Sequence, residues 1–550
     1  MTLEEELQQV FKGEIKSDKA SLDAASSDAS IFQIEPSLVV APRDSADVQS
    51  LVTFVNENKK HYPNLSLTAR AAGTDMGGGP LTSSVVVDFM PHFQGVINVD
   101  ETRKEATVLP GTYYRDFEKA TLAKGLLLPC YTASRELNTV GGMVANNSAG
   151  EKTLTYGQTA RYVKELKVVM SDGKDYTFEP LTLPALLEKE KQNNFEGKLY
   201  RDLHKILDDN KELIAKAKPK VSKNSAGYML WDIWDGKTFD LTKLIIGSQG
   251  TLCFVTEITF KLIKPKAHSA LLIIFLDELD MLAKVVEAVL AYKPESFESY
   301  DDHTMRLAVR FMPDLLKRLG ARNLISLGLK FWPEIKMIAF GGTPELVLVA
   351  EFSGDREKEV YEKAYLAERG LKEFDIRTHV AKDDAEEEKY RVIRRESFNL
   401  LRKHVHGKHT APFIDDIVVA PNRLPEFLPK LNEIMKGYDI TYTIAGHIGD
   451  GNFHIIPLMD FSRPDFKQVI AELSYRVYEL VIQFDGSITG EHNDGLIRTP
   501  YLEKMYGKEV IELFRQVKHL FDPQNIFNPD KKVGGSLANS YEHIRHSWPE

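Results

Sequence analysis

The stretch Ala445-Gly446-His447-Ile448-Gly449-Asp450-Gly451-Asn452-Phe453-His454 lies within residues 441–458, whose pattern predicts a strand, a glycine-rich turn and a second strand. Two histidines seven residues apart in such a hairpin can be returned to one point. A second short segment, GEHNDG at residues 490–495, contains a glutamate followed by a third histidine. The two segments are therefore candidates for one site.

Imidazole and carboxylate groups together form the ligand set of a divalent transition-metal site such as Zn²⁺ or Mn²⁺. The predicted ligands are His447, His454 and Glu491. Three protein ligands leave coordination positions open, as a catalytic metal requires, and His492 beside them is a candidate base. The alternative is a hairpin whose histidines are satisfied by backbone carbonyls.

Composition narrows the function classes. The chain has 550 residues, a formal net charge of −10 and only two cysteines, Cys130 and Cys253. The acidic balance and lack of a basic arm argue against a nucleic-acid binder. Two cysteines favour a reducing compartment. The first residues lack the features of a signal peptide, and no run reaches the roughly 20 apolar residues of a membrane span. We expect a cytoplasmic protein, with peripheral contact at the inner face of the membrane still open.

The character of the chain changes near residue 265. Residues 1–35 are predicted to form a helical lead-in, and 36–265 alternate short strands with helices. Residues 266–535 show a β-α-β alternation that predicts helices over an antiparallel sheet. Residues 536–550 are predicted to be a tail.

Three glycine-containing loops lie in the first of these two regions. Residues 70–79, RAAGTDMGGG, follow a predicted strand, and successive glycines let backbone N–H groups approach an anion such as a diphosphate. Residues 134–150 offer small and amide side chains that can line a flat ring. Residues 247–252 are predicted to lie between two strands. Each loop alone is also compatible with a tight turn.

The order of seven motifs gives the strongest indication. They are PSLVVAPRD (36–44), RAAGTDMGGG (70–79), NTVGGMVANNSAG (138–150), IIGSQGTLCFVTEITFKL (245–262), AGHIGDGNFH (445–454), GEHNDG (490–495) and FDPQNIFNPDKK (521–532). This series resembles the FAD-linked oxidases of the vanillyl-alcohol-oxidase/p-cresol-methylhydroxylase superfamily. Within it, the chain resembles the group that contains D-lactate dehydrogenase, the D component of glycolate oxidase and D-2-hydroxyglutarate dehydrogenase.

The resemblance implies an α+β fold. A two-subdomain FAD-binding domain of the p-cresol-methylhydroxylase (PCMH) type would be followed by an α+β FAD-linked oxidase C-terminal domain that caps the flavin. By the same resemblance, the residues that hold FAD are Arg70, Ala71, Gly73, Thr74, Asp75, Met76, Gly77, Ser134, Asn138, Thr139, Gly141, Gly142, Ala145, Asn146, Gly150 and Ile258. Relatives with covalent flavin carry a histidine in the first loop. Here that loop reads Ala72-Gly73-Thr74, so non-covalent FAD is expected, and Cys130 is expected to be a buried small residue rather than a thioether link.

The resemblance also implies the reaction. It predicts an FAD-dependent dehydrogenase that oxidises a D-2-hydroxy acid, most nearly D-lactate, to the 2-oxo acid. The metal would acidify the hydroxyl, His492 would take its proton, and hydride would pass to flavin N5. Arg395 would bind the substrate carboxylate through its two parallel donors, with Lys408 a weaker candidate. Ile456 replaces an asparagine found in the 2-hydroxyglutarate enzymes, which disfavours a second substrate carboxylate. Asp415 and Asp416 either orient the metal-binding histidines from behind or are simple strand-end carboxylates.

The sequence predicts the electron acceptor and other partners only by class. Electrons would leave to a quinone, a cytochrome or an Fe–S partner protein, because two cysteines cannot build clusters. An alternative function is the flavin subunit of a multi-component glycolate- or lactate-oxidising complex. The basic, partly apolar segment 305–336 predicts a helical insertion packed on the substrate domain, with a membrane-surface contact as the rival interpretation. The sequence also allows a homodimer.

Overall fold

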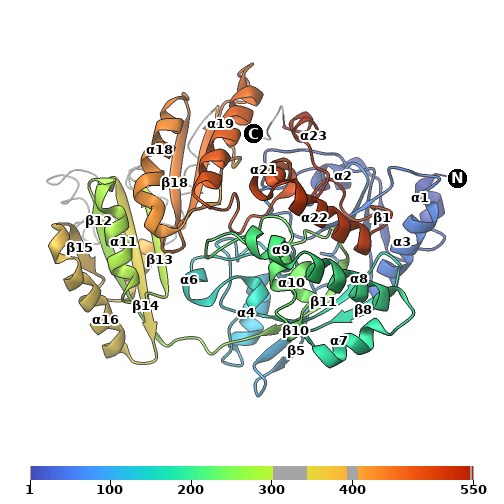
Figure 1. The fold of residues 1–550 in the computed structure, drawn as a ribbon, viewed down its shortest axis with the longest axis horizontal. Coiled ribbons are helices and arrows are strands. Elements are labelled where there is room, and N and C mark those ends of the chain that lie inside the picture. The colour runs from blue at the N-terminus through green and yellow to red at the C-terminus, as the bar shows by residue number, and fades with distance from the viewer. Residues whose placement is uncertain (1, 302–343, 393–406, 546–547, 549–550) are drawn as a thin grey trace.

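The computed structural model describes residues 2–301, 344–392, 407–545 and 548. These residues form sheets of four, five and eight strands, together with a two-stranded ribbon. Figure 1 shows the first two sheets in one half of the molecule and the eight-stranded sheet with its helices in the other. No described helix is both long and apolar enough to cross a membrane.

The four-stranded sheet contains the first glycine loop. Its order is β1 (Glu14–Lys16), β2 (Leu38–Ala41), β4 (Val85–Asp88) and β3 (Leu67–Arg70), with β2 and β3 both parallel to β4. Parallel strands are buried on both faces, which explains the continuous valine runs of β2 and β4. The helices of this part are α1 (Leu3–Leu7), α2 (Lys19–Ala25) and α3 (Ser45–Asn58).

The first 35 residues differ from the expected helical lead-in. Two short helices are present there, but β1 also pairs antiparallel with β2 and extends the first sheet. Three residues with intermediate burial carry little periodicity, so this strand depends on its partner rather than on its own sequence.

The five-stranded sheet is antiparallel throughout, in the order β5 (Val96–Asp100), β6 (Glu105–Val108), β11 (Phe254–Lys261), β7 (Val163–Val169) and β8 (Asp175–Phe178). The associated elements are α4 (Tyr114–Leu122), α5 (Val140–Asn146), α6 (Thr153–Tyr156), η1 (Thr159–Arg161), β9 (Leu181–Thr182), α7 (Leu183–Glu190), α8 (Phe195–Asp209), α9 (Lys211–Ala217), η2 (Leu230–Asp232), β10 (Thr238–Phe239) and α10 (Thr242–Ile245).

The third glycine loop does not lie between two strands, which corrects the expectation from the sequence. It connects α10 to β11. The apolar residues before Gly247 form one buried helical turn, and periodicity cannot separate so short an apolar run from a strand.

The eight-stranded sheet forms the second half of the molecule. Its order is β15 (Arg377–Val380), β12 (His268–Leu276), β14 (Leu346–Gly354), β13 (Ser296–Asp301), β18 (Thr441–His447), β19 (Asn452–Met459) and β16 (His409–Thr410), with β17 (Ile417–Val418) also on β19. Its helical elements are η3 (Leu279–Met281), α11 (Leu282–Leu290), α16 (Glu357–Gly370), η4 (Lys372–Phe374), η5 (Pro421–Arg423), α18 (Leu424–Lys436), η6 (Ile448–Asp450) and α19 (Phe466–Gln483). Neighbouring strands pair antiparallel throughout this sheet, which matches the expected layer of helices over an antiparallel sheet.

The C-terminal part of the chain returns to the first half. The elements that lie there are red beside blue and green elements in Figure 1. They are α20 (Gly495–Arg498), η7 (Thr499–Tyr501), α21 (Leu502–Tyr506), α22 (Lys508–Phe521) and α23 (Leu537–Glu542). The Leu67 amide donates to the Ile526 carbonyl at 2.7 Å, and the Asn528 amide donates to the Leu67 carbonyl at 2.9 Å. Residues 526–528 therefore continue the edge of β3, and the first glycine loop begins just beyond it.

A buried ion pair stabilises the packing of the C-terminal part against the first half. The Lys518 ammonium donates to Asp522 and to the Thr251 and Phe527 carbonyls, while Asp522 also accepts from two backbone amides. Both side chains are buried, so the pair stabilises the fold only while it is complete.

Replacing Lys518 by methionine should leave the Asp522 carboxylate buried without its cation and lower the free energy of unfolding by about 3–5 kcal/mol. The urea midpoint of the variant against the parent chain measures this. Lys508→Met, an exposed position on the same helix, should change stability by no more than about 0.5 kcal/mol. Equal midpoints for Lys518→Met and the parent would contradict the role of the pair.

Candidate active site

One cavity of about 1550 Å³ connects the two halves of the molecule. Most of its described lining lies within residues 27–30, 69–80, 132–149 and 245–255 on one side, and within 407–415, 443–458 and 491–492 on the other. The glycine loops and the predicted metal ligands therefore face the same space.

Most predicted cofactor residues line this cavity. They are Arg70, Ala71, Gly73, Thr74, Asp75, Met76, Ser134, Asn138, Thr139, Gly141, Gly142, Ala145 and Asn146. Gly77, Gly150 and Ile258 are not among the lining residues; Ile258 is fully buried in β11, opposite Val108 and Leu166. The cavity and its wall of small residues fit an extended flavin cofactor.

The first loop is shaped by its own aspartate. The Gly77 and Gly79 amides donate to Asp75 Oδ2 at 3.0 and 2.7 Å, and Asn146 donates to Asp75 Oδ1. These two amides are thus engaged by a carboxylate, whereas the sequence suggests that glycine amides in this loop meet a diphosphate. The binding of a diphosphate by this loop remains a prediction.

Cys130 lies away from the cavity. Its side chain is fully buried in the core and approaches Thr159 Oγ1 at 3.8 Å, and burial raises the pKa of its thiol to about 12. A buried, neutral thiol is inert, in agreement with its expected role as a small core residue.

The predicted hairpin brings His447 and His454 together. His447 ends β18 and His454 is the third residue of β19, opposite Ala445. The turn between them closes at Gly451, which has φ +68°, and a Cβ there would lie 1.8 Å from the Val419 carbonyl oxygen. Only glycine can occupy this position.

Glu491 completes the group from a separate loop. Its Oε1 lies 3.2 Å from His447 Nε2 and 3.4 Å from His454 Nε2. Donors held about 2.0–2.2 Å from a tetrahedral Zn²⁺ lie roughly 3.3–3.6 Å from one another. The spacing and the donor types both fit a divalent cation.

The outer nitrogen of each imidazole is bound to a carboxylate. His447 Nδ1 lies 2.7 Å from Glu298 Oε1, and His454 Nδ1 lies 3.1 Å from Asp415 Oδ1. Such partners hold a metal-binding imidazole in one tautomer and orientation. Of the two interpretations that the sequence offers for Asp415, the geometry favours the one in which it orients a histidine.

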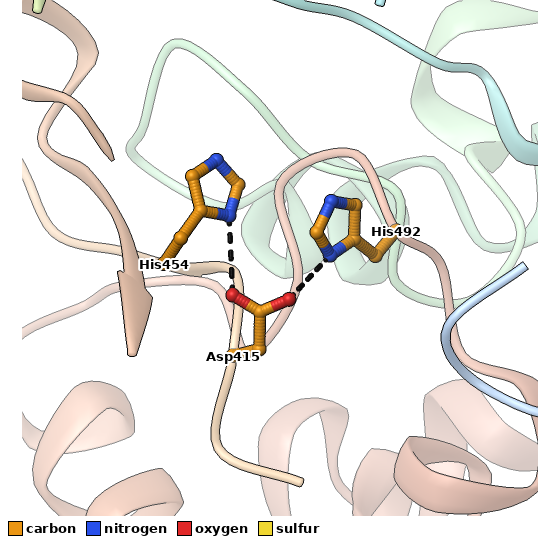
Figure 2. A group of neighbouring side chains, drawn as sticks. All are labelled: Asp415, His454 and His492. Carbon is orange, nitrogen blue, oxygen red and sulfur yellow. Dashed lines mark hydrogen bonds and ion pairs between the residues drawn. The ribbon is translucent and has the colours of Figure 1, made fainter. Parts of the chain in front are cut away.

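Asp415 also contacts the third histidine. Its Oδ2 lies 2.6 Å from His492 Nδ1, so one carboxylate lies between His454 and His492 (Figure 2). The two rings stack with centroids 5.0 Å apart. Because Nδ1 of His492 meets Asp415, Nε2 is the ring nitrogen left for chemistry, and His492 lines the cavity.

The neighbouring Asp416 has a different role. It accepts hydrogen bonds from the Glu491 and His492 amides at 2.8 and 2.7 Å, from Thr489 Oγ1 and from Asn452 Nδ2. This carboxylate contacts backbone amides and two uncharged side chains rather than imidazole, and it ties the loop of Glu491 to the hairpin.

Electrostatics in the group favour bound positive charge. Burial lowers the pKa of His454, but Asp415 and Glu491 outweigh it and raise the pKa to about 10. Burial raises the pKa of Glu491, while Lys223, His447 and His454 hold it well below the ordinary value. The site therefore attracts a proton or a metal ion, and a metal must displace the proton since it binds the neutral imidazole.

Some predicted residues lie outside the described part of the chain. Arg395 and the basic segment 305–336 are among them. Lys408 is described and lines the cavity, with its Nζ 3.5 Å from Thr441 Oγ1. Ile456 lines the cavity two residues along β19 from His454.

Two residues of the site were missed by sequence reasoning. Glu298 lies between Phe297 and Ser299 on β13, a strand that is buried along its whole length. Lys223 is fully buried behind Glu491. Its surroundings, Ser-Lys-Asn-Ser-Ala-Gly, are typical of a surface loop and carried no signal.

Comparison with known families finds two matches in this chain. Residues 36–178 match the family described as FAD binding domain, and residues 264–532 match FAD linked oxidases, C-terminal domain.

Relatives and structures agree with these matches. The chain is 27% identical to the D-2-hydroxyglutarate dehydrogenase of Pseudomonas putida over 95% of its own length and 50% of the relative's. It is 27% identical to "Glycolate oxidase subunit GlcD" of Bacillus subtilis, covering 91% of this chain and 89% of that one. The chain thus spans about half the length of the first relative.

A solved 4-ethylphenol oxidase from Gulosibacter chungangensis shares the fold, with a TM-score of 0.68 at 14% identity, covering 97% of this chain and 96% of that one. The fold and these matches lead to one conclusion: the chain contains an FAD binding domain followed by the C-terminal domain of the FAD linked oxidases.

Proposed function

We propose that this protein is an FAD-dependent dehydrogenase that oxidises a D-2-hydroxy acid to the 2-oxo acid with the help of a divalent metal. The observation that carries the proposal is the convergence of His447, His454 and Glu491 on one point of the cavity that the FAD-binding loops also line. The names of the relatives support a 2-hydroxy acid as the substrate class.

The residues of the site fit both groups, FAD in the glycine loops and Zn²⁺ or Mn²⁺ at the three donors. When bound, FAD supplies the acceptor for the Cα hydride and the cation supplies a Lewis acid for the hydroxyl. The three donors would hold the cation at the capping sheet, opposite the cofactor loops.

His492 is the proposed general base. Asp415 meets its Nδ1 and leaves Nε2 to take the hydroxyl proton, and the charge of Asp415 raises the pKa of His492 against the lowering effect of burial. The contact with Asp415 also orients the ring, as a base needs before proton transfer. Arg395, outside the described residues, remains the proposed partner of the substrate carboxylate.

Ile456 would limit the substrate side chain. It lies on the face of β19 that carries His454, opposite Thr443, and both line the cavity. An isoleucine cannot pair with a second carboxylate, and burying an ionised group without a partner costs several kcal/mol. We therefore favour D-lactate, or a slightly longer aliphatic D-2-hydroxy acid, over dicarboxylates.

An alternative is a flavin subunit that works only within a larger electron-transfer complex. The similarity over most of a protein named as a glycolate oxidase subunit favours it. In both cases the electron acceptor would be a quinone, a cytochrome or an Fe–S protein.

Replacing His447 or His454 by alanine should remove most of the bound metal and most of the turnover, because each variant loses one of three protein ligands. Even the loss of a residue that only orients a ligand typically lowers metal affinity or activity 10–100-fold. Metal is measured by elemental analysis of the purified variants. FAD should stay stoichiometric and be released by acid into the supernatant, as expected for a non-covalent cofactor. His61→Ala, at an exposed histidine, is the matched control. Full metal occupancy in both variants would show that the metal is bound elsewhere.

His492→Asn should keep metal and FAD but slow flavin reduction by roughly 10²–10⁴-fold, the usual contribution of a general base. Anaerobic rapid mixing with saturating substrate, followed by flavin absorbance, measures the step directly. An unchanged rate would assign proton removal to another group.

Steady-state kcat/KM should be higher for D-lactate than for D-2-hydroxyglutarate or D-malate, since a second carboxylate would lie against Ile456. The purified chain with an artificial acceptor dye provides the assay, and Ile456→Asn should move the preference towards the dicarboxylates. A parent chain that prefers either dicarboxylate rules out Ile456 as the specificity determinant. Flavin that is reduced by substrate but not turned over with the dye would support the subunit alternative.

A further inference from the structure

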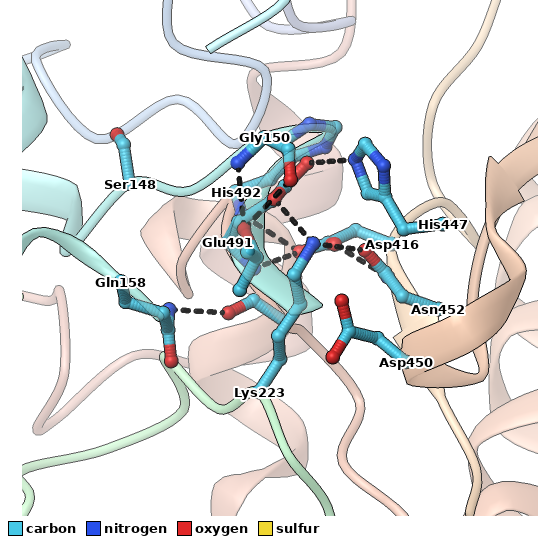
Figure 3. A network of polar contacts seen from close by, with 12 residues as sticks. Ser148, Gly150, Gln158, Lys223, Asp416, His447, Asp450, Asn452, Glu491 and His492 are labelled. Atoms are coloured by element: carbon cyan, nitrogen blue, oxygen red, sulfur yellow. Dashed lines mark hydrogen bonds and ion pairs between the residues drawn. The ribbon is translucent and has the colours of Figure 1, made fainter. Parts of the chain in front are cut away.

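Lys223 is a fully buried lysine directly behind the proposed metal ligands. Its Nζ donates to Glu491 Oε2 at 2.8 Å and to Asn452 Oδ1 at 3.1 Å (Figure 3). It is not among the described residues that line the cavity. Its ammonium thus contacts a ligand from one segment and a neighbour of His454 from the other.

The segment that contains Lys223 is docked on both ligand segments. Ser222 Oγ donates to Asp450 Oδ1 at 2.7 Å, Ser225 Oγ donates to the Gly490 carbonyl at 2.8 Å, and the Gly227 amide donates to Asp494 Oδ2 at 2.8 Å. Residues 222–227 belong to the first half of the molecule, whereas Asp450 belongs to the capping half, and Gly490 and Asp494 lie in the loop that leads from the capping half back to the first. The contacts of Ser222 before Lys223, and of Ser225 and Gly227 after it, therefore hold the lysine in place.

The two oxygens of Glu491 have different partners as a result. Oε2 accepts from Lys223, and Oε1 faces the Nε2 atoms of His447 and His454. Carboxylates bind cations through one oxygen or through both. With Oε2 engaged by a buried ammonium, only Oε1 is directed at the point where the imidazoles converge.

We propose that Lys223 is a positioning residue that restricts Glu491 to a single metal-binding oxygen and so sets the coordination number of the site. The inference rests on the proposed function, because it assumes a metal at His447, His454 and Glu491. A lower coordination number leaves positions open for the substrate hydroxyl and carboxylate.

Charge explains why a lysine is needed. Glu298, Asp415, Asp450 and Glu491 are all buried around the two imidazoles. A carboxylate whose cationic partner is removed in such surroundings must find another donor or a new orientation. Without the ammonium, Glu491 can turn Oε2 towards the metal.

Lys223→Met removes the charge and keeps most of the side-chain volume. The probe is Co²⁺ bound at saturating concentration to the FAD-containing protein, since its visible bands report ligand number and geometry. The parent should show the stronger absorption of low coordination, and Lys223→Met should show weaker, shifted bands because Glu491 binds through both oxygens. At saturating metal, flavin reduction should fall roughly 10–100-fold, mainly in kcat.

A second measurement needs no metal. In metal-free protein Lys223→Met should lower the thermal midpoint, and adding Glu491→Gln should restore part of the loss, because the double variant no longer buries an unpaired carboxylate. Lys518→Met, another buried lysine–carboxylate pair, is the control: it should lower the midpoint but leave the Co²⁺ bands unchanged.

The outcomes separate the two proposals. A parent chain that binds no Co²⁺ at these ligands overturns the metal-assisted function and this inference with it. A parent that binds Co²⁺, with identical bands in Lys223→Met, overturns only the role of Lys223. Equal spectral changes in Lys223→Met and Lys518→Met would also overturn it, because they would reflect general loss of stability.

Discussion

The buried carboxylate of Asp416 is the interaction on which the candidate site depends. It lies at φ +67° with no exposed surface and accepts hydrogen bonds from two backbone amides, a threonine and an asparagine. A buried charge is tolerated when donors surround it. Since the donors come from both the Glu491 loop and the hairpin, satisfying this one charge fixes the two segments relative to each other.

The site is built in layers around this anchor. Three site residues each have a polar atom that faces away from the point where they converge, and each of these atoms has a partner. Glu298 contacts Nδ1 of His447, Asp415 contacts Nδ1 of His454, and Lys223 donates to Oε2 of Glu491. These partners come from three further segments, one of them in the FAD-binding half. The inward donors are thereby directed at one point, and pre-organisation of this kind lowers the cost of binding at a site.

The two halves of the chain also depend on each other for stability. Lys532 is fully buried and pairs with Asp494 at 2.8 Å while donating to the Ser225 and Gly227 carbonyls. Asp494 in turn accepts from the Gly227 amide. The C-terminal residues, the GEHNDG loop and the 222–227 segment therefore form one buried polar network, and such networks stabilise only when every member is satisfied.

Much of the fold could be predicted from local patterns. The alternation and turn residues of 441–458 predict the hairpin of β18 and β19, and the pattern of 266–535 predicts helices over an antiparallel sheet. The glycine loop 70–79 is recognisable as part of the ordered series of motifs, since alone it is also compatible with a tight turn. Predictions are less accurate where a short element depends on its partner: the residues of β1 do not predict a strand, and those of α10 wrongly predict one.

The sequence by itself determined which residue types were available to the site: two histidines at hairpin spacing, a Glu-His pair between glycines, and small residues for a flat cofactor. Only the tertiary structure decided which partners complete it. Glu298, Asp415 and Lys223 lie 149, 39 and 268 residues from the site residues they contact. Periodicity and motif spacing describe neighbours along the chain, whereas the pairing of buried charges is set by strand register and by the docking of the two halves. That is why the candidate ligands, and Asp415 as one of two interpretations, could be named from the sequence, whereas Glu298 and Lys223 could not.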